Sequence, residues 1–199
     1  MPYTTPRTWT AGELVTAAMM NAEVRDNIAN GVFHKIAEAT GASATYDFTS
    51  IPQLYRSYAI VTNARGDTAA TTVSLRMRLQ NISTASYYDQ SVSGAAATVT
   101  GAEVIAGTSG RIGLCSAASA AATLTGTTFT ILPNVLQANK EKAWISISVG
   151  IGGLTTGTLT CGVWGGIFDS TSAIDRITIL PSAGNFVADG VCTVYGLPF

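Results

Sequence analysis

The strictest constraint on the fold comes from a run of nine residues in which apolar and polar side chains alternate without a break. In residues 72–80 the apolar positions are Val73, Leu75, Met77 and Leu79, and the positions between them are polar or charged. Successive side chains of a β-strand point to opposite faces of the sheet, so this period of two predicts a strand. One face of that strand should lie in a core and the other in water.

Further strands are predicted on both sides of this run, separated by Gly, Asn, Asp and Pro at the spacing typical of a sandwich or barrel. They are residues 58–62, 127–132, 144–150, 158–164, 173–180 and 191–197. Residues 83–110 are rich in Ala, Ser and Gly, which predicts a long excursion with weak pairing. Residues 111–125 are predicted to hold one short strand, 111–115, and then an Ala-rich loop. Together, about eight mostly antiparallel strands predict a jelly-roll-like β-sandwich over residues 41–199.

The chain begins differently, because residues 6–30 are predicted to form an extended arm and one isolated helix. Thr10 and Glu13 have the spacing of a capping box, and Trp9 and Leu14 stand at the two positions of a hydrophobic staple. The helix carries one apolar stripe, formed by Met20, Val24 and Ile28.

Two interpretations of this helix stay open. It packs on its own domain, or it docks into an assembly and bundles with copies of itself. Residues 31–39 have a composition that could extend the helix by two turns. We therefore divide the chain into residues 1–40, an arm with an anchor or oligomerisation helix, and residues 41–199, the sandwich.

The composition bears on partners. Apolar residues make up 47% of the chain and charged residues only 12%, with a net charge of −1, whereas about a quarter of a soluble domain is normally charged. Burial of surface in an oligomer or a particle would explain the deficit; a surface rich in Thr and Ser is the alternative. No basic cluster is present, so we expect no nucleic-acid binding. No apolar run is long enough to span a bilayer, so we expect no membrane insertion.

The sequence offers little for a metal or a disulfide framework. Cys115, Cys161 and Cys192 are odd in number and widely spaced. Each lies among small apolar residues, where a thiol is expected to pack as a small hydrophobe. His34 is the only histidine. We expect neither a metal site nor a cofactor.

The sequence also offers few candidates for catalytic residues. A glycosidase needs a pair of carboxylates, and the best candidates in the β region are Asp169, Asp175 and Asp189. Asp169 and Asp189 stand in turn sequences, where an Asp side chain ordinarily caps the backbone. No catalytic residue is therefore predicted.

Aromatic residues are the other source of function. Tyr87 and Tyr88 precede Asp89 in the predicted excursion. Adjacent exposed aromatics beside a carboxylate suit recognition of a carbohydrate or a protein, so these three are the candidate host-recognition residues. The alternative is that one tyrosine points inward and seals the sandwich. Trp144 and Trp164 are predicted to lie in the core or at an interface.

The N-terminal run also resembles a known group. TWTAGELVTAAMMNAEVRDNIA, residues 8–29, is similar to the N-terminal segment of many small bacteriophage virion proteins, in which W-x-x-G-E-x-V-T-A-x-x-M-N-x-x-V-R-D-N recurs. Residues 48–65 are similar to the first strand pair of their β-domain. Residues 173–197 are similar to their last strands, which commonly end in a Leu-Tyr-Gly-type motif; here the ending is Val-Tyr-Gly-Leu, residues 194–197.

The resemblance implies a non-enzymatic, trimeric tail-fibre or tail-tip component of a virion, made in the host cytoplasm and released by lysis. Its N-terminus would bind other virion proteins and its own copies, and its sandwich would attach to a host glycan or protein. The expected anchor residues are Trp9, Leu14, Met20, Val24 and Ile28. Two alternatives remain: a capsid head-fibre or decoration protein, and a surface-glycan hydrolase.

Overall fold

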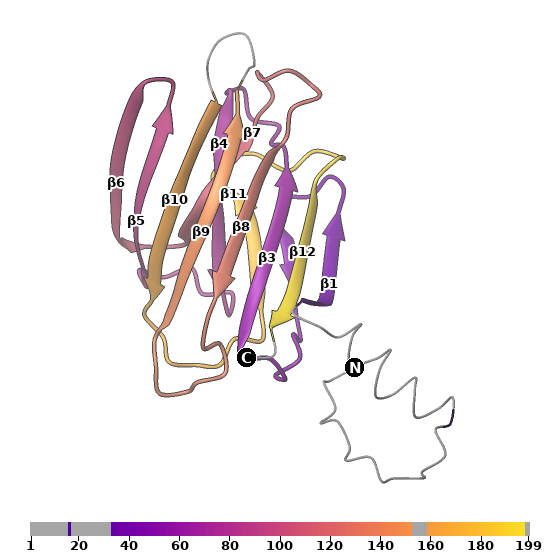
Figure 1. Ribbon diagram of the computed structural model, residues 1–199, viewed down its shortest axis with the longest axis vertical. Coiled ribbons are helices and arrows are strands. Elements are labelled where there is room, and N and C mark those ends of the chain that lie inside the picture. Colours follow the sequence, from indigo (N-terminus) through magenta and orange to yellow (C-terminus); the bar gives the residue numbers. More distant parts are fainter. Residues whose placement is uncertain (1–15, 17–32, 153–158, 198–199) are drawn as a thin grey trace.

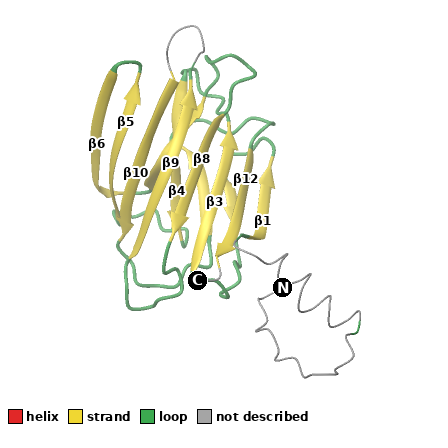
Figure 2. Cartoon of the chain, in the orientation of Figure 1, coloured by secondary structure: helices red, strands yellow, loops and turns green. Residues whose placement is uncertain are grey.

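A computed structural model describes Thr16 and residues 33–152 and 159–197 of the chain. Within these ranges the protein forms twelve β-strands and no helix (Figures 1 and 2). The strands make two antiparallel sheets that lie one behind the other. The expectation of a mainly β sandwich is confirmed. The predicted N-terminal helix and all five anchor residues lie outside the described residues, and the jelly-roll connectivity stays a prediction.

The large sheet has eight strands. Their order is β1 (His34–Thr40), β12 (Val191–Leu197), β3 (Ser57–Ala64), β8 (Gly126–Leu132), β9 (Lys142–Ile151), β10 (Leu159–Phe168), β5 (Tyr87–Ala95) and β6 (Thr98–Gly107). The small sheet has four, in the order β2 (Tyr46–Phe48), β11 (Ile177–Pro181), β4 (Thr72–Leu79) and β7 (Gly110–Ser116). In Figure 1, β1 stands at one end of the large sheet and the β5–β6 hairpin at the other.

The alternating run became β4, and its apolar face is the one predicted. The buried side chains of this strand are Val73, Leu75, Met77 and Leu79. They meet aromatic and aliphatic side chains of β2, β3, β11 and β12 in one continuous core, which includes Tyr46, Tyr58, Ile60, Ile177, Ile179 and Val194. The period of two therefore identified both the strand and the direction of the core.

Two expectations were wrong. Residues 34–40 do not extend a helix: they form β1, which pairs with β12, and Ile36 and Ala39 of β1 pack against the core. The open edge of β12 outweighs the helical preference of the Ala, Glu and Lys residues here. Residues 83–110 are not a weakly paired excursion, because most of them form the β5–β6 hairpin, in register with β10 through residues 87–95.

Candidate functional site

Strand β9 turns its two central isoleucines away from the domain, although Trp144 near its start is buried. Ile145 and Ile147 are 55% and 59% exposed, whereas Ser146 between them and Ser148 after them are each 1% exposed. A half-buried antiparallel strand normally places its apolar residues toward the core and its polar residues toward water. β9 has the reverse arrangement.

The three other strands of this region, β8, β10 and β5, also expose apolar side chains. The buried positions of β8 and β5 include the hydroxyl side chains of Thr128, Thr130 and Ser91, whereas those of β10 are Trp164 and Phe168. The exposed positions of the three strands carry large apolar side chains: Phe129 on β8, Val163 and Ile167 on β10, and Tyr88 and Val92 on β5. Large apolar side chains are thus exposed on all four strands, while the inward hydroxyls belong to β8, β9 and β5.

Strand register joins these residues into one surface. Val163 of β10 pairs with Val92 of β5 on one side and with Ile147 of β9 on the other. Ile147 in turn pairs with Phe129 of β8. Side chains of directly paired residues lie on the same face and touch. We call this surface the outer face; its principal residues are Val92, Phe129, Ile145, Ile147, Val163 and Ile167.

The inward hydroxyls have a structural reason, which is the close approach of β7. The Ser146 hydroxyl donates to the carbonyl of Ile112 on β7 at 2.5 Å and lies 2.8 Å from the Thr130 hydroxyl. Ser148 accepts a hydrogen bond from the backbone N–H of Leu114, also on β7, at 2.9 Å. A Cβ atom added at Gly113 would collide with the Ser148 side chain. Small hydroxyl side chains therefore pack here, and bulky apolar ones would not fit.

No charged side chain contributes to the exposed surface of these four strands. The two charged residues that they contain, Asp89 and Lys142, are both buried. Asp89 accepts hydrogen bonds from the guanidinium and the backbone N–H of Arg111. The Lys142 ammonium donates to three backbone carbonyls, and burial lowers its pKa. The outer face is therefore both apolar and uncharged.

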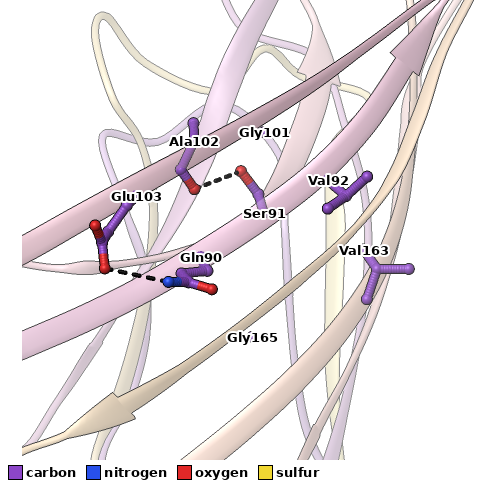
Figure 3. A pocket seen from close by; sticks show the side chains of 8 residues that line it. All are labelled: Gln90, Ser91, Val92, Gly101, Ala102, Glu103, Val163 and Gly165. Carbon is purple, nitrogen blue, oxygen red and sulfur yellow. Dashed lines mark hydrogen bonds between the residues drawn. The ribbon is translucent and has the colours of Figure 1, made fainter.

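Beside β6 the outer face is hollowed. Figure 3 shows this hollow, of about 520 Å³, between β10, β5 and β6. Glycines at positions 101 and 165 leave it open, and Val92 and Val163 stand along it. Two hydrogen bonds join β5 and β6 at the hollow: the Gln90 amide donates to the Glu103 carboxylate at 3.1 Å, and the Ser91 hydroxyl donates to the carbonyl of Ala102 at 3.4 Å.

One of the three cysteines lies on this surface. Cys161 is exposed and pairs in register with Val149 of β9 and Gly94 of β5. The expectation that every thiol packs inside is therefore wrong for Cys161. It holds for Cys115 and Cys192, which are buried, and burial raises the pKa of both thiols to about 12.

The expected host-recognition residues do not form an exposed cluster. Tyr87 is fully buried: its hydroxyl accepts from the backbone N–H of Leu79 and donates to the carbonyl of Ile82. Asp89 is the buried partner of Arg111. Both face inward because they alternate with Tyr88, which is 39% exposed and belongs to the outer face. The expectation of an exposed Tyr-Tyr-Asp loop is thus corrected, and the alternative of one inward tyrosine holds.

The candidate carboxylates stand in loops. Asp169 and Asp175 lie in the connection between β10 and β11, and Asp189 lies just before β12; all three are exposed. His34 lies on β1 and stacks on Tyr55, with ring centroids 5.6 Å apart. In the described part of the chain, no three His, Cys, Asp or Glu side chains are grouped as a metal site would require.

Sequence reasoning found the strand around residues 144–150 but did not identify its exposed face as a site. The signal was present, since Ile145, Ile147 and Val149 alternate with Trp144, Ser146 and Ser148.

No protein-family model, curated protein or solved structure matches this chain. Among the described residues, no helix has the length and hydropathy to cross a membrane.

Proposed function

We propose that this protein is a non-enzymatic structural component of a bacteriophage virion, a homotrimer at a tail fibre or tail tip. Its N-terminus anchors it to other virion proteins, and its sandwich is presented for host attachment. The observation that carries the proposal is the outer face, where four neighbouring strands expose large apolar side chains and no charge. Contiguous apolar patches of this kind mark interaction surfaces.

The free energy gained by burying the outer face supports assembly. The six principal side chains of the outer face are each roughly half exposed. Full burial of one such side chain contributes about 1.5–3 kcal/mol, so burying the exposed halves of six contributes roughly 5–9 kcal/mol. That is of the order of the free-energy cost of associating two proteins, about 4–15 kcal/mol. Burial of the outer face would therefore offset much of the cost of association, and the rest of the contact would supply the net affinity.

The N-terminal segment adds a second argument. Phe33, which lies in the predicted anchor segment of residues 1–40, packs against Phe129 and Tyr195, with ring centroids 6.4 Å and 5.9 Å apart. Phe129 is itself a residue of the outer face. The segment predicted to anchor the protein therefore joins the domain beside its most apolar surface. The phage origin and the number three rest on the resemblance of residues 8–29 to virion proteins.

Host contact is assigned to the end of the large sheet that carries β5 and β6. Of the three expected recognition residues, only Tyr88 has an exposed side chain, and it stands on the β5–β6 hairpin side of the sheet. The hairpin projects at the end of the sheet (Figure 1) and carries Val99 and Ile105 as exposed side chains. Contact with a host glycan or protein is proposed there.

Locating the protein in purified phage particles tests the proposal. We expect stoichiometric amounts by mass spectrometry of the particles, and gold-labelled antibody at the tail tip in electron micrographs. Label on the head would select the alternative of a head-fibre or decoration protein. Absence from purified particles, with the protein abundant in the infected-cell lysate, would overturn a virion role. Release of reducing sugar from host envelopes by the pure protein would instead favour a glycan hydrolase.

A further inference from the structure

We infer that the outer face is the interface between copies of this chain: the strands β8, β9, β10 and β5 of one copy pack against the same strands of another. The inference deepens the proposed function, on which its trimeric state rests, by naming the surface that holds the copies together. Its occupant is a second copy of the chain.

The size of the surface fits such an interface. β9 and β10 each have ten residues. β8 has 7 residues and β5 has 9. At about 3.4 Å per residue and about 4.8 Å between strands, the four strands cover roughly 590 Å². Standard interfaces bury about 600–1,000 Å² on each partner, so the outer face lies at the lower end of that range.

The shape of the outer face also fits a second copy of the chain. Ile145 and Ile147 project from β9, and the hollow of about 520 Å³ begins at the next strand, β10, beside Val163, and extends across β5 to β6. One face thus offers both the protruding side chains and a recess to receive them. The isoleucines of one copy enter the hollow of the next, and a closed ring satisfies every face.

Charge supports the same occupant. The exposed surface of β8, β9, β10 and β5 carries no charged side chain. Two copies therefore approach without like-charge repulsion, which otherwise costs several kcal/mol at an interface. The charged side chain that lines the hollow is Glu103 of β6, whose carboxylate accepts a hydrogen bond from Gln90. Self-association is the contact that this composition favours.

Cys161 is a built-in reporter for the contact. It is exposed on this surface, whereas Cys115 and Cys192 are buried. A thiolate is the reactive form of cysteine. Burial raises the pKa of both buried thiols to about 12. A thiol reagent added to the folded protein therefore reacts with Cys161.

The experiment follows the reaction of the unmodified full chain with Ellman's reagent over a dilution series, with light scattering on the same samples. We expect an oligomer in which the Cys161 thiol reacts at least about tenfold more slowly than in the dissociated chain. A tenfold slower reaction corresponds to an outer face that is covered about nine-tenths of the time. Full reactivity in the oligomer would place the contact on another surface and overturn the inference. Protection in a monomer would mean that the chain covers its own face, and would overturn it too.

A pair of variants sharpens the test. Ile147→Lys places a charge in the middle of the outer face, at a side chain that is 59% exposed. Leu54→Lys is its matched control, because Leu54 is 60% exposed but lies in the loop between β2 and β3. We expect Ile147→Lys to remain a β-fold, to scatter as a monomer and to react fully at Cys161. Leu54→Lys should behave as the parent.

An Ile147→Lys oligomer with a protected thiol would refute the interface. If Ile147→Lys fails to fold, Ile147→Ser and the dilution series of the parent decide the question. A dimer with a protected Cys161 would support the interface and contradict the trimer in the proposed function. Particles that contain the protein, together with an unprotected Cys161, would leave the virion role standing and remove only the interface.

Discussion

Two adjacent residues of β9 should respond to substitution in the opposite way from what their hydropathy indicates. Ser146→Val makes a buried position more apolar, and Ile147→Thr makes an exposed position more polar. A conventional half-buried strand would gain stability from the first and lose it from the second. Because β9 places hydroxyls toward β7 and isoleucines outward, we expect Ser146→Val to be the damaging change.

The structure sets the magnitudes. Ser146→Val removes the hydroxyl that bonds the Ile112 carbonyl and the Thr130 hydroxyl, and a buried polar group left without a partner costs about 1–3 kcal/mol. The added methyl groups meet β7 at its closest approach, and overpacking costs about 1–3 kcal/mol more. Ser146→Val should therefore lower the free energy of unfolding by about 2–6 kcal/mol.

Ile147→Thr should cost far less in the separated chain. The side chain is 59% exposed, so only its smaller, buried part loses contact, worth about 1 kcal/mol or less. Threonine keeps the β-branched shape that suits a strand. In the assembled protein the same change removes an interface contact, so its cost should grow with protein concentration.

Urea unfolding followed by tryptophan fluorescence measures both effects, because Trp144 is buried on the same strand. Ser146→Ala is the control that removes the hydroxyl without adding volume, and it should lie between the parent and Ser146→Val. The reasoning is refuted if Ser146→Val is as stable as the parent, or if Ile147→Thr is the more damaging change in a sample that scatters as a monomer.

Three further outcomes are expected. Leu75→Asp should abolish the β-type circular dichroism, because it buries an unpaired charge. Arg76→Ala, on the other face of β4, should change the free energy of unfolding by no more than about 0.5 kcal/mol. Equal losses of stability from both variants would contradict the assignment of faces. The Arg176 guanidinium, and then the hydroxyl of Thr178, lower the pKa of Asp47 below its usual 3.8. Its contribution to stability should therefore be complete above pH 3.8 and be lost as the pH falls through the lower folded value; Asp47→Asn should remove that loss from an acid titration of the urea midpoint. Deleting residues 1–32 should leave the sandwich monodisperse, whereas deleting β1 as well exposes the edge of β12 and should cause aggregation, measured by light scattering.

The sequence predicted strands where side-chain chemistry and topology agree. In β4, alternation identified both the strand and its buried face, since Leu75 and Met77 point into the core. In β9 the same kind of alternation identified the strand only. A period of two shows that the faces differ, but it does not show which face meets the rest of the domain. That decision is made by β7, whose approach admits Ser146 and Ser148 and leaves Ile147 outside.

The two misassigned segments failed for a related reason. Ala, Ser and Gly are weak strand formers, so residues 83–110 carried little local signal. Their strand state comes from pairing with β10 over nine registered positions, 87–95. β1 likewise becomes a strand through β12, which lies more than 150 residues away in the chain. Strand pairing across such distances is a property of the whole fold, and no local window of sequence contains it.

The host-recognition residues show how one such error propagates. Tyr87, Tyr88 and Asp89 were grouped because a loop would expose all three. A strand separates them, since neighbouring side chains point to opposite faces. Tyr87 and Asp89 therefore have structural partners, Leu79 and Arg111, and Tyr88 alone keeps an exposed ring.

The two faces of β8, β9 and β5 have different roles: the inward face contributes to folding, and the outer face is available for assembly. Where β7 lies closest to β9, the contact is made by the hydroxyls of Ser146 and Ser148, which bind the β7 backbone, while Trp144, Tyr87 and Phe168 fill the neighbouring core. The Ile, Val and Phe residues of the same strands are then free to serve a third layer. If another copy covers the outer face, as proposed, this arrangement would also account for part of the low charge of the chain, because that face would have no surface left for charged residues. Substitutions inside should change the stability of a single copy, and substitutions outside should change how copies associate. A fold that used one core for both tasks could not divide its mutations in that way.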